Sequence, residues 1–362
     1  MCSFSQKILI FIMKNLKNLT LPQLEDFVLS LPEQRFRARQ LFKWMYQKRL
    51  PDFSDMTNMP KTLRAALSER ASIAKLPPLR ALESSAGDAV KFAFALGGSD
   101  YAVESVLLID GERRTACLSS QLGCGLGCAF CETAKLGFIR NLSPSEILGQ
   151  LIGMNDYQAA RGDKLVTNIV FMGMGEALSN YENFMAALSV IMHEDAFNVG
   201  ARRITVSTAG VVPNIERLMG ENLTIGLAIS LNAWNDEARG ELMPINKKYP
   251  IAALVDVAER YHNRTGRRVT FEYVLIEGKT DTPEAAEALS RLLGGFPCKV
   301  NLIPVNPVAP RMAAPDDGAV QKFADALYGR GLAATVRKSR GRDIFGACGQ
   351  LTAELIKTAA PP

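Results

Sequence analysis

Residues 115–131 read Thr-Ala-Cys-Leu-Ser-Ser-Gln-Leu-Gly-Cys-Gly-Leu-Gly-Cys-Ala-Phe-Cys and join a strand-like run to a cysteine-rich loop. The loop places Cys124, Cys128 and Cys131 at C-x3-C-x2-C spacing. The glycines between and before them allow the backbone to curl closely around a bound group. This segment therefore predicts a metal-type loop that caps the first strand of an α/β domain.

The loop supplies three thiolates, which is one ligand short of a structural zinc site. Neither of the two histidines, His193 and His262, lies nearby in the sequence. A four-iron cluster held by three cysteines leaves one iron open to chelate an amine and a carboxylate, as the reductive cleavage of S-adenosylmethionine (SAM) requires. The spacing favours such a cluster, with a zinc loop as the alternative.

Strand-like and helix-like runs alternate after this loop. Apolar strand runs lie near residues 166–172, 203–207, 224–231, 268–276, 299–303 and 333–337. Amphipathic runs lie near residues 145–161, 181–193, 212–219, 251–263, 283–294 and 318–329. This alternation is typical of parallel βα units, and about six units are too few to close a TIM barrel. We predict an α/β fold, a partial open (β/α)6 TIM-like barrel with its chemistry at the carboxyl ends of the strands.

The composition indicates a folded protein outside the membrane. The chain has 362 residues, 48% hydrophobic and 22% charged, with a net charge of +5 that permits a nucleic-acid partner. No apolar run approaches the length of a membrane span. The run at residues 8–12 is too short for a signal peptide, and four of the seven cysteines cluster within residues 117–131. Clustered thiols are typical of a metal or redox site, so we expect a cytoplasmic protein.

The N-terminal part reads as a separate helical module. Its basic residues indicate either a solvated helix surface or contacts with RNA phosphates; they are Arg35, Arg37, Arg39, Lys43, Lys48 and Arg49. The domain prediction is an over-called or disordered start at 1–18, a helical RNA-binding accessory domain at 19–82, a linker and β-hairpin at 83–112, a core barrel at 113–350 and a tail at 351–362.

Several motifs, in order along nearly the whole chain, resemble the radical SAM RNA adenine methyltransferases of the RlmN/Cfr family. Besides the cysteine loop and its continuation through residues 132–142, they comprise Arg-Phe-Arg-Ala-Arg-Gln at 35–40, Gly-Met-Gly-Glu at 173–176, Met-Pro-Ile-Asn-Lys-Lys-Tyr at 243–249 and Ala-Cys-Gly-Gln-Leu at 347–351. The match is closer to RlmN than to Cfr. The resemblance implies the radical SAM fold, one (4Fe–4S) cluster held by the three loop cysteines, and two SAM molecules per turnover.

The resemblance also assigns SAM contacts. It implies that Gly175 and Glu176 bind the methionine amine, which suits a carboxylate placed after an apolar strand. Further contacts are implied at Ser207, Ser230, Leu231, Asn232 and Asn306. Taken alone, the Gly-Glu turn reads as an ordinary strand-to-helix connection.

Three further residues receive catalytic roles from the resemblance. Cys348 is implied to take a methyl group from one SAM and to carry it, after radical activation, onto a ring carbon of adenine as a covalent protein–RNA adduct. Cys117 is implied to resolve that adduct by forming a disulfide with Cys348. Glu104 is implied to accept the departing ring proton. Without the resemblance, Cys348 reads as a buried structural thiol and Glu104 as a solvent-facing strand residue.

Basic residues precede the implied methyl carrier. Arg337, Lys338, Arg340 and Arg342 give a cationic rim suited to RNA phosphates. A buried radical also requires the target nucleotide to leave its stack and enter the barrel.

The expected substrates are 23S rRNA, at the peptidyl-transferase centre, and tRNA, at the adenosine beside the anticodon. Carbon-2 is the favoured position, although Asn232, Ala177 and Glu132 depart from the RlmN pattern, and Cfr-type carbon-8 methylation is the alternative. We expect a monomer with an electron donor such as flavodoxin and no membrane partner. A non-catalytic, zinc-dependent RNA-binding protein is the alternative from a different functional class.

Overall fold

The structure is a computed structural model that describes residues 13–97, 99–306 and 312–355. The chain forms two compact units. Unit 1 comprises the chain up to Lys75 together with Ala186–Asn198, and unit 2 comprises Leu76–Met185 and the chain from Val199 onward. The run at residues 8–12 lies outside the described residues.

Unit 1 is mainly helical. Its elements are β1 (Lys14–Asn15), η1 (Leu16–Asn18), α1 (Leu21–Leu29), α2 (Phe36–Tyr46), η2 (Phe53–Asp55), α3 (Lys61–Arg70) and β2 (Ala71–Ser72). β1 pairs in parallel with β2, and the buried Lys17 donates from Nζ to the carbonyl of Ile73 at 2.6 Å. Residues 14–18 are therefore part of this fold, and the prediction of a disordered segment reaching residue 18 was wrong for them.

The basic side chains of α2 face acids of the same unit. Lys43 lies 3.1 Å from Asp195, and Arg39 lies 3.9 Å from the same carboxylate. The side chains of Arg39 and Lys43 remain more than half exposed. Exposed ion pairs of this kind contribute little stability, and the cations stay accessible to a polyanion.

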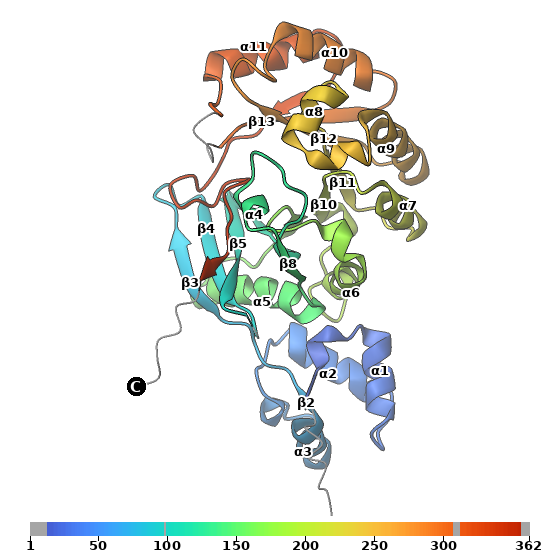
Figure 1. The fold of residues 1–362 in the computed structure, drawn as a ribbon. Helices are drawn as coiled ribbons and strands as arrows, with labels where there is room; N and C mark the ends of the chain where they lie inside the picture. The colour runs from blue at the N-terminus through green and yellow to red at the C-terminus, as the bar shows by residue number, and fades with distance from the viewer. Residues whose placement is uncertain (1–12, 98, 307–311, 356–362) are drawn as a thin grey trace, which may run out of the picture. The chain divides into compact units, whose positions relative to one another are not determined.

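Unit 2 is built on a large mixed sheet (Figure 1). Its strand order is β14-β13-β12-β11-β10-β9-β6-β5-β4-β3, with β15 paired to β5. The strands are β3 (Pro78–Glu83), β4 (Ala89–Ala95), β5 (Tyr101–Asp110), β6 (Arg113–Cys117), β9 (Asn168–Phe171), β10 (Ile204–Thr208), β11 (Gly226–Ser230), β12 (Val269–Leu275), β13 (Cys298–Pro304), β14 (Ala334–Val336) and β15 (Glu354–Leu355).

The stretch from β6 to β14 is parallel, and helices follow its strands. The larger helices are α5 (Pro144–Ala160), α6 (Tyr181–Met192), α7 (Val212–Gly220), α9 (Ile251–Thr265), α10 (Pro283–Leu293) and α11 (Asp317–Tyr328). The part of α6 from Ala186 onward belongs to unit 1. In the described part of the sheet, β14 and β3 are edge strands that do not pair with each other. The predicted open, partial barrel is confirmed, and the short strand β14 corresponds to the strand run predicted near residues 333–337.

Shorter elements lie at the carboxyl ends of the parallel strands. They are β7 (Gln121–Gly123), α4 (Glu132–Lys135), β8 (Phe138–Asn141), η3 (Ala177–Asn180), α8 (Asp236–Leu242) and η5 (Pro244–Lys247). A further short element, η4 (Ala201–Arg203), directly precedes β10 and lies at its amino end. β7 and β8 form a separate antiparallel hairpin that flanks the cysteine loop. The cysteine loop between β7 and α4 and the turn before η3 carry residues that line the cavity described below, and strands of the main sheet supply most of the others.

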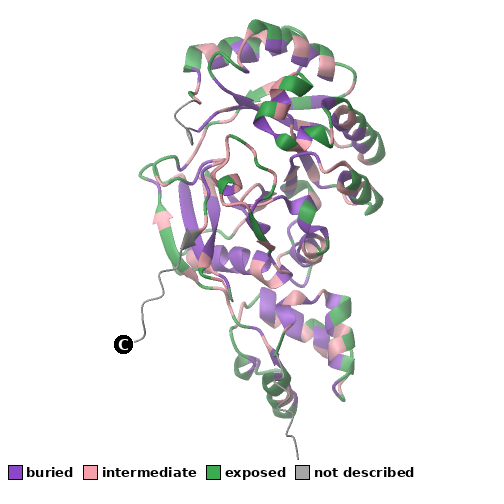
Figure 2. Cartoon of the chain, in the orientation of Figure 1, coloured by how far each residue is buried: buried purple, intermediate pink, exposed green. Residues whose placement is uncertain are grey.

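The antiparallel strands β3, β4 and β5 extend the same sheet. β3 begins at Pro78, so the predicted boundary of the helical domain at residue 82 lies too far along the chain. The boundary falls between Lys75 and Leu76 because the main chain of β3 pairs with β4 over most of its length. β4 is buried on both faces, which explains the continuous purple of its ribbon in Figure 2. Within the described residues, no helix is long and apolar enough to cross a membrane.

Candidate active site

A cavity of about 730 Å³ occupies the inner face of the parallel strands in unit 2. Its walls use every second residue of a strand, such as Thr270, Glu272 and Val274 of β12, because alternate side chains point to the same face of a sheet. Five cysteines also line this cavity, namely Cys117, Cys124, Cys128, Cys131 and Cys348. The fold thus brings the cysteine loop and the two isolated thiols to one space.

Main-chain hydrogen bonds fix the cysteine loop. The Cys124 amide donates to the Gly137 carbonyl at 2.8 Å, and the Ala129 amide donates to the Leu242 carbonyl at 2.9 Å. The Glu132 amide donates to the Gly349 carbonyl at 2.7 Å, which ties the cysteine loop to the segment carrying Cys348. A Cβ added at Gly349 would lie 2.7 Å from the Phe130 carbonyl oxygen, so this close approach needs glycine.

The three loop thiols hold their protons unless a cation is present. Burial raises the pKa of Cys124 to about 11, and it also raises the pKa values of Cys128 and Cys131. Charges of neighbouring loop cysteines further disfavour the thiolates of Cys124 and Cys128, and the charge of Cys348 disfavours that of Cys131. Three thiolates at this position therefore require a positively charged group to stabilise them.

The arrangement of these thiols fits a cluster better than a single ion. One zinc ion binds each sulfur at about 2.3 Å, which draws all of its ligands to one point. Within the described residues, no three His, Cys, Asp or Glu side chains gather closely enough to ligate one metal ion. A four-iron cluster binds each cysteine at a different iron, so its ligands surround a shared space. Cys124, Cys128 and Cys131 around one cavity meet that requirement.

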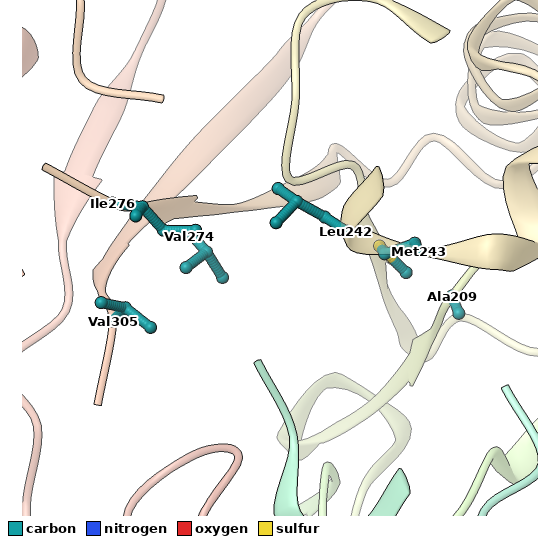
Figure 3. Packing of buried hydrophobic residues seen from close by; sticks show 6 residues of the cluster. All are labelled: Ala209, Leu242, Met243, Val274, Ile276 and Val305. Atoms are coloured by element: carbon teal, nitrogen blue, oxygen red, sulfur yellow. The ribbon is translucent and has the colours of Figure 1, made fainter. Parts of the chain in front are cut away.

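An apolar layer packs against the cysteine loop. It consists of Ala209, Leu242, Met243, Val274, Ile276 and Val305, which Figure 3 shows. Leu126, Cys128 and Phe130 of the loop pack against this layer. Apolar surroundings exclude water from one side of a bound cluster and so influence its reduction potential.

Glu176 places a carboxylate deep in the same cavity. The side chain is buried, and its two oxygens accept from the amides of Ala209, at 2.7 Å, and Leu178, at 3.1 Å. Burial raises the pKa of Glu176 to about 7, although these two amides oppose the shift. A buried carboxylate with only neutral donors can bind an ammonium group of a ligand. Gly175, the residue before Glu176, has a φ of 92°, so the turn has a left-handed conformation at this position.

The other residues expected to contact SAM differ in their surroundings. Ser207, Ser230, Asn232 and Asn306 line the cavity, whereas Leu231 is a buried residue outside its lining. The Leu231 amide donates to the Glu272 carbonyl at 3.0 Å. Leu231 can therefore contribute its main chain to the site.

Cys117 and Cys348 are free thiols of the same cavity wall. Burial raises the pKa of Cys117 to about 12, and the charge of Cys348 adds to the shift while Arg337 opposes it. The Arg337 guanidinium is held near both thiols, and the negative charge of Cys348 in turn raises the pKa of Arg337. Cys348 is only partly buried, so its sulfur can be reached from the cavity.

Glu104 lies apart from the cavity lining. Its side chain is fully buried, with Oε1 2.7 Å from the Lys91 ammonium and Oε2 accepting from the Thr352 amide at 2.9 Å. The carboxylate thus has a cation and an amide as partners. The reading of Glu104 as a solvent-facing strand residue was wrong because both faces of this part of β5 are covered.

The four cations near Cys348 have different partners. Arg337, Lys338 and Arg340 line the cavity, and Arg342 lies outside its lining. Arg340 lies 2.9 Å from Asp110, and Arg342 donates from Nε to Asn306 at 2.8 Å. Only part of this basic segment therefore faces the cavity directly.

Comparisons with known proteins agree with this geometry. Residues 14–73 match the ribosomal RNA large subunit methyltransferase N-terminal domain, and residues 118–289 match the radical SAM superfamily. The dual-specificity RNA methyltransferase RlmN of Geobacter sulfurreducens is 44% identical over 95% of this chain and 93% of its own. The RlmN of Marinobacter nauticus is 45% identical over 93% of this chain and 92% of its own. The chain belongs to the RlmN family.

A solved structure supports the same assignment for the fold. The crystal structure of a radical SAM methyltransferase from Sphaerobacter thermophilus superposes with a TM-score of 0.89 at 44% identity. It covers 93% of this chain and 99% of the other. The radical SAM fold is therefore established, and membership of the superfamily implies a (4Fe–4S) cluster and SAM.

The structure gives a reason for one departure from the RlmN pattern. Asn232 stands where histidine was expected, and its φ of 60° lies in the left-handed region. Asparagine and histidine are both enriched there among residues other than glycine, so the substitution keeps the backbone conformation. Asn232 also accepts from the Val274 amide at 3.1 Å. Ala177 is buried at the start of η3, and Glu132 pairs with Lys135 at 2.5 Å.

Sequence reasoning missed Arg239, a fully buried residue of α8. Its guanidinium donates to the carbonyls of Ala209 at 2.7 Å, Ser230 at 3.1 Å and Leu231 at 3.0 Å. These carbonyls lie at the ends of β10 and β11, so Arg239 fixes the backbone that presents the expected SAM contacts. No motif marks this arginine in the sequence read alone.

A second missed feature is a polar row across three strands. Glu272, Asn301 and Thr335 are register partners on β12, β13 and β14, and all line the cavity. Thr335 donates to Asn301 at 3.3 Å, and Asn301 donates to Glu272 at 2.8 Å. The spacing of polar residues in these strands was the available signal, because inward positions of a packed barrel are usually apolar.

Proposed function

We propose that this chain is a radical SAM RNA methyltransferase that adds a methyl group to carbon-2 of an adenine in 23S rRNA and of the adenosine beside the tRNA anticodon. The observation that carries the proposal is that Cys117, Cys348 and the three loop cysteines line one cavity. The curated relatives that match over most of the chain are dual-specificity RNA methyltransferases. The proposal includes two SAM molecules per turnover, an external electron donor of the flavodoxin type and a monomeric enzyme.

The residues have distinct parts in this proposal. Cys124, Cys128 and Cys131 would hold the cluster, and Glu176 would bind the ammonium group of SAM. When bound, the cluster supplies the electron that turns SAM into a source of a carbon radical. Ser207, Ser230, Asn232 and Asn306 would orient the cofactor from the strand ends.

Cys348 would first act as a nucleophile. Its sulfur attacks the methyl group of a sulfonium, so that a carbon–sulfur bond forms at Cys348, the sulfonium bond breaks and the thiol proton is released. Partial exposure to the cavity makes this sulfur accessible. Arg337, whose guanidinium interacts electrostatically with this residue, places a positive charge beside the attacking sulfur.

Cys117 and Glu104 complete the proposed sequence. Cys117 would form a disulfide with Cys348 as the methylated base leaves, which requires their Cα atoms to approach within about 7 Å. Glu104 would accept the ring proton. The Glu104 carboxylate already pairs with Lys91 and accepts from the Thr352 amide. Accepting the ring proton therefore requires either a rearrangement around β5 or transfer of the proton through Lys91.

The decisive experiment measures modified nucleosides. Anaerobically reconstituted protein, SAM and a reductant are incubated with 23S rRNA fragments or tRNA lacking the modification, and the digested nucleosides are analysed by mass spectrometry. We expect 2-methyladenosine from the unaltered chain and none from Cys348→Ala. Cys298→Ala is the matched control, because Cys298 is a buried thiol outside the cavity lining.

The alternatives give different products. Formation of 8-methyladenosine would assign Cfr-type chemistry to the same site. A loaded protein that yields no methylated nucleoside and no deoxyadenosine from either RNA would overturn the proposal. Protein that contains one zinc ion and no iron or sulfide would favour the RNA-binding alternative.

A further inference from the structure

The segment between β14 and Cys348 exposes an aromatic side chain in an unusual conformation. Phe345 is 64% exposed, and its φ of 51° lies in the left-handed region. Bulky residues seldom adopt this conformation, and residues held there cluster at functional sites. Asn198, Asn222 and Asn232 also have positive φ, which asparagine tolerates readily, and so does Arg49, which has no aromatic ring. Phe345 therefore combines backbone strain with an aromatic ring that no apolar core covers.

Hydrogen bonds hold the segment in place. The Gly346 amide donates to the Gly341 carbonyl at 2.8 Å, and the Phe345 amide donates to the Arg342 carbonyl at 3.2 Å. The Asp343 carboxylate accepts from the Ser85 amide at 2.7 Å. A backbone fixed on both sides of Phe345 keeps its ring exposed, so the strain is maintained by the surrounding structure.

The charge around Phe345 identifies the kind of partner. Residues 337–342 contain four cations, and Lys338 and Arg342 among them are exposed. The carboxylate of Asp343, which follows these cations in the sequence, accepts a hydrogen bond from the Ser85 amide. An exposed aromatic ring beside several cations matches single-stranded nucleic acid, which offers bases for stacking and phosphates for pairing.

The position of Phe345 near the cavity indicates which RNA base its ring can contact. Phe345 precedes Cys348 by three residues, and Gly346, Ala347 and Cys348 line the cavity. A nucleotide whose base enters this cavity therefore has its neighbours in the strand near Phe345. Once the target base has left the stack, the adjacent base has lost a stacking partner that an aromatic ring can replace.

We propose that Phe345 stacks on the unpaired RNA base next to the target adenosine while the target occupies the cavity. This inference rests on the proposed function and names the residue that engages the flanking nucleotide. It makes Phe345 a positioning residue for RNA. The ring stabilises the opened form of the strand, which lowers the cost of extruding the target.

The test uses a stem-loop RNA with the target adenosine in its loop and 2-aminopurine at the adjacent position. Stacking of 2-aminopurine on an aromatic ring quenches its fluorescence. We expect quenching on binding to the reconstituted chain, a loss of that quenching with Phe345→Gly, and an affinity about tenfold weaker. Phe345→Trp is expected to restore both. Tyr328→Ala is the matched control, because Tyr328 is 77% exposed on α11 and outside the cavity lining.

Thermal unfolding separates this role from a structural one. Glycine adopts a positive φ without strain, so Phe345→Gly is expected to raise the Tm while it weakens RNA binding. A Phe345→Gly variant that binds and quenches as the Tyr328→Ala variant does would overturn the inference. If the unaltered chain methylates RNA but Phe345→Gly leaves the quenching intact, this inference alone fails. If the unaltered chain neither binds nor methylates RNA, the proposed function fails as well.

Discussion

Asn306 donates from Nδ2 to the main-chain carbonyl of Cys348 at 3.0 Å. Its Oδ1 accepts from Nε of Arg342 at 2.8 Å, so one buried amide joins the chain after β13 to the segment that carries Cys348. The sequence resemblance assigned Asn306 to the cofactor. The structure adds that the same side chain holds the backbone of Cys348 against the barrel.

Replacing Asn306 by alanine is expected to misplace Cys348. Both hydrogen bonds are lost, and a displacement of about 1 Å at a reacting atom can reduce a rate about 100-fold. We expect a loss of that order in RNA methylation and in the formation of methyl-cysteine at Cys348. Intact-protein mass spectrometry measures the second quantity directly. Unchanged iron and sulfide content would show that the cluster loop is unaffected, whereas normal methylation of Cys348 would contradict the positioning role.

The raised pKa of Glu176 predicts a pH dependence of SAM binding. Because burial raises this pKa to about 7, the free protein carries a neutral acid below that pH and must release its proton to bind an ammonium group. Affinity for SAM should therefore fall about tenfold per pH unit below 7 and level off above it. Equilibrium dialysis between pH 5.5 and 8.5 measures this. Glu176→Gln should bind weakly at every pH, and an equal slope in this variant would exclude Glu176 as the titrating group.

The raised pKa of Glu176 also makes the stability of the cofactor-free protein depend on pH. The folded-state pKa of Glu176 is higher than its unfolded value, so the folded state binds the proton more tightly. The resulting stabilisation is complete below about pH 4.5 and is lost as the pH rises through 7. Denaturant unfolding should show this dependence in the unaltered chain and a weaker one in Glu176→Gln. SAM should remove much of the loss because its ammonium group compensates the buried charge.

Much of the fold could be predicted because its signals are local. The alternation of apolar strands with amphipathic helices can be recognised within short windows of sequence. For example, the helix predicted near residues 251–263 is α9 at Ile251–Thr265. The three loop cysteines could be found by spacing for the same reason. The contacts of Glu104 with Lys91 and of Arg239 with three carbonyls could not, because they depend on strand register and on chain segments that meet only in the folded sheet. The strain at Phe345 likewise belongs to the backbone, and the residue type gives no sign of it.

The burial of Cys117 predicts slow alkylation. With a pKa raised to about 12, chiefly by burial, only about one molecule in 10⁴ carries the thiolate at pH 8. We expect iodoacetamide to modify Cys117 at least about 100-fold more slowly than a cysteine in an unfolded peptide, with a rate that rises about tenfold per pH unit. Quantitative peptide mass spectrometry follows this rate. Arg337→Gln should slow it further because the guanidinium favours the thiolate, whereas Lys338→Gln, which changes an exposed neighbouring cation, should not.

Arg239 is expected to be one of the most sensitive positions for stability. Burial lowers its pKa to about 10, so the guanidinium is still charged at neutral pH and is stabilised by backbone carbonyls and by Asn246 at 2.9 Å. Arg239→Met leaves these buried acceptors unsatisfied, which should lower the free energy of unfolding by about 3 kcal/mol or more. Arg291→Met is the control, because Arg291 is exposed on α10 and forms a surface pair with Glu287, a kind of pair worth about 0.3–0.5 kcal/mol. Denaturant unfolding of both variants at one pH compares them directly, and equal midpoints would contradict the role of Arg239 as the anchor of β10 and β11.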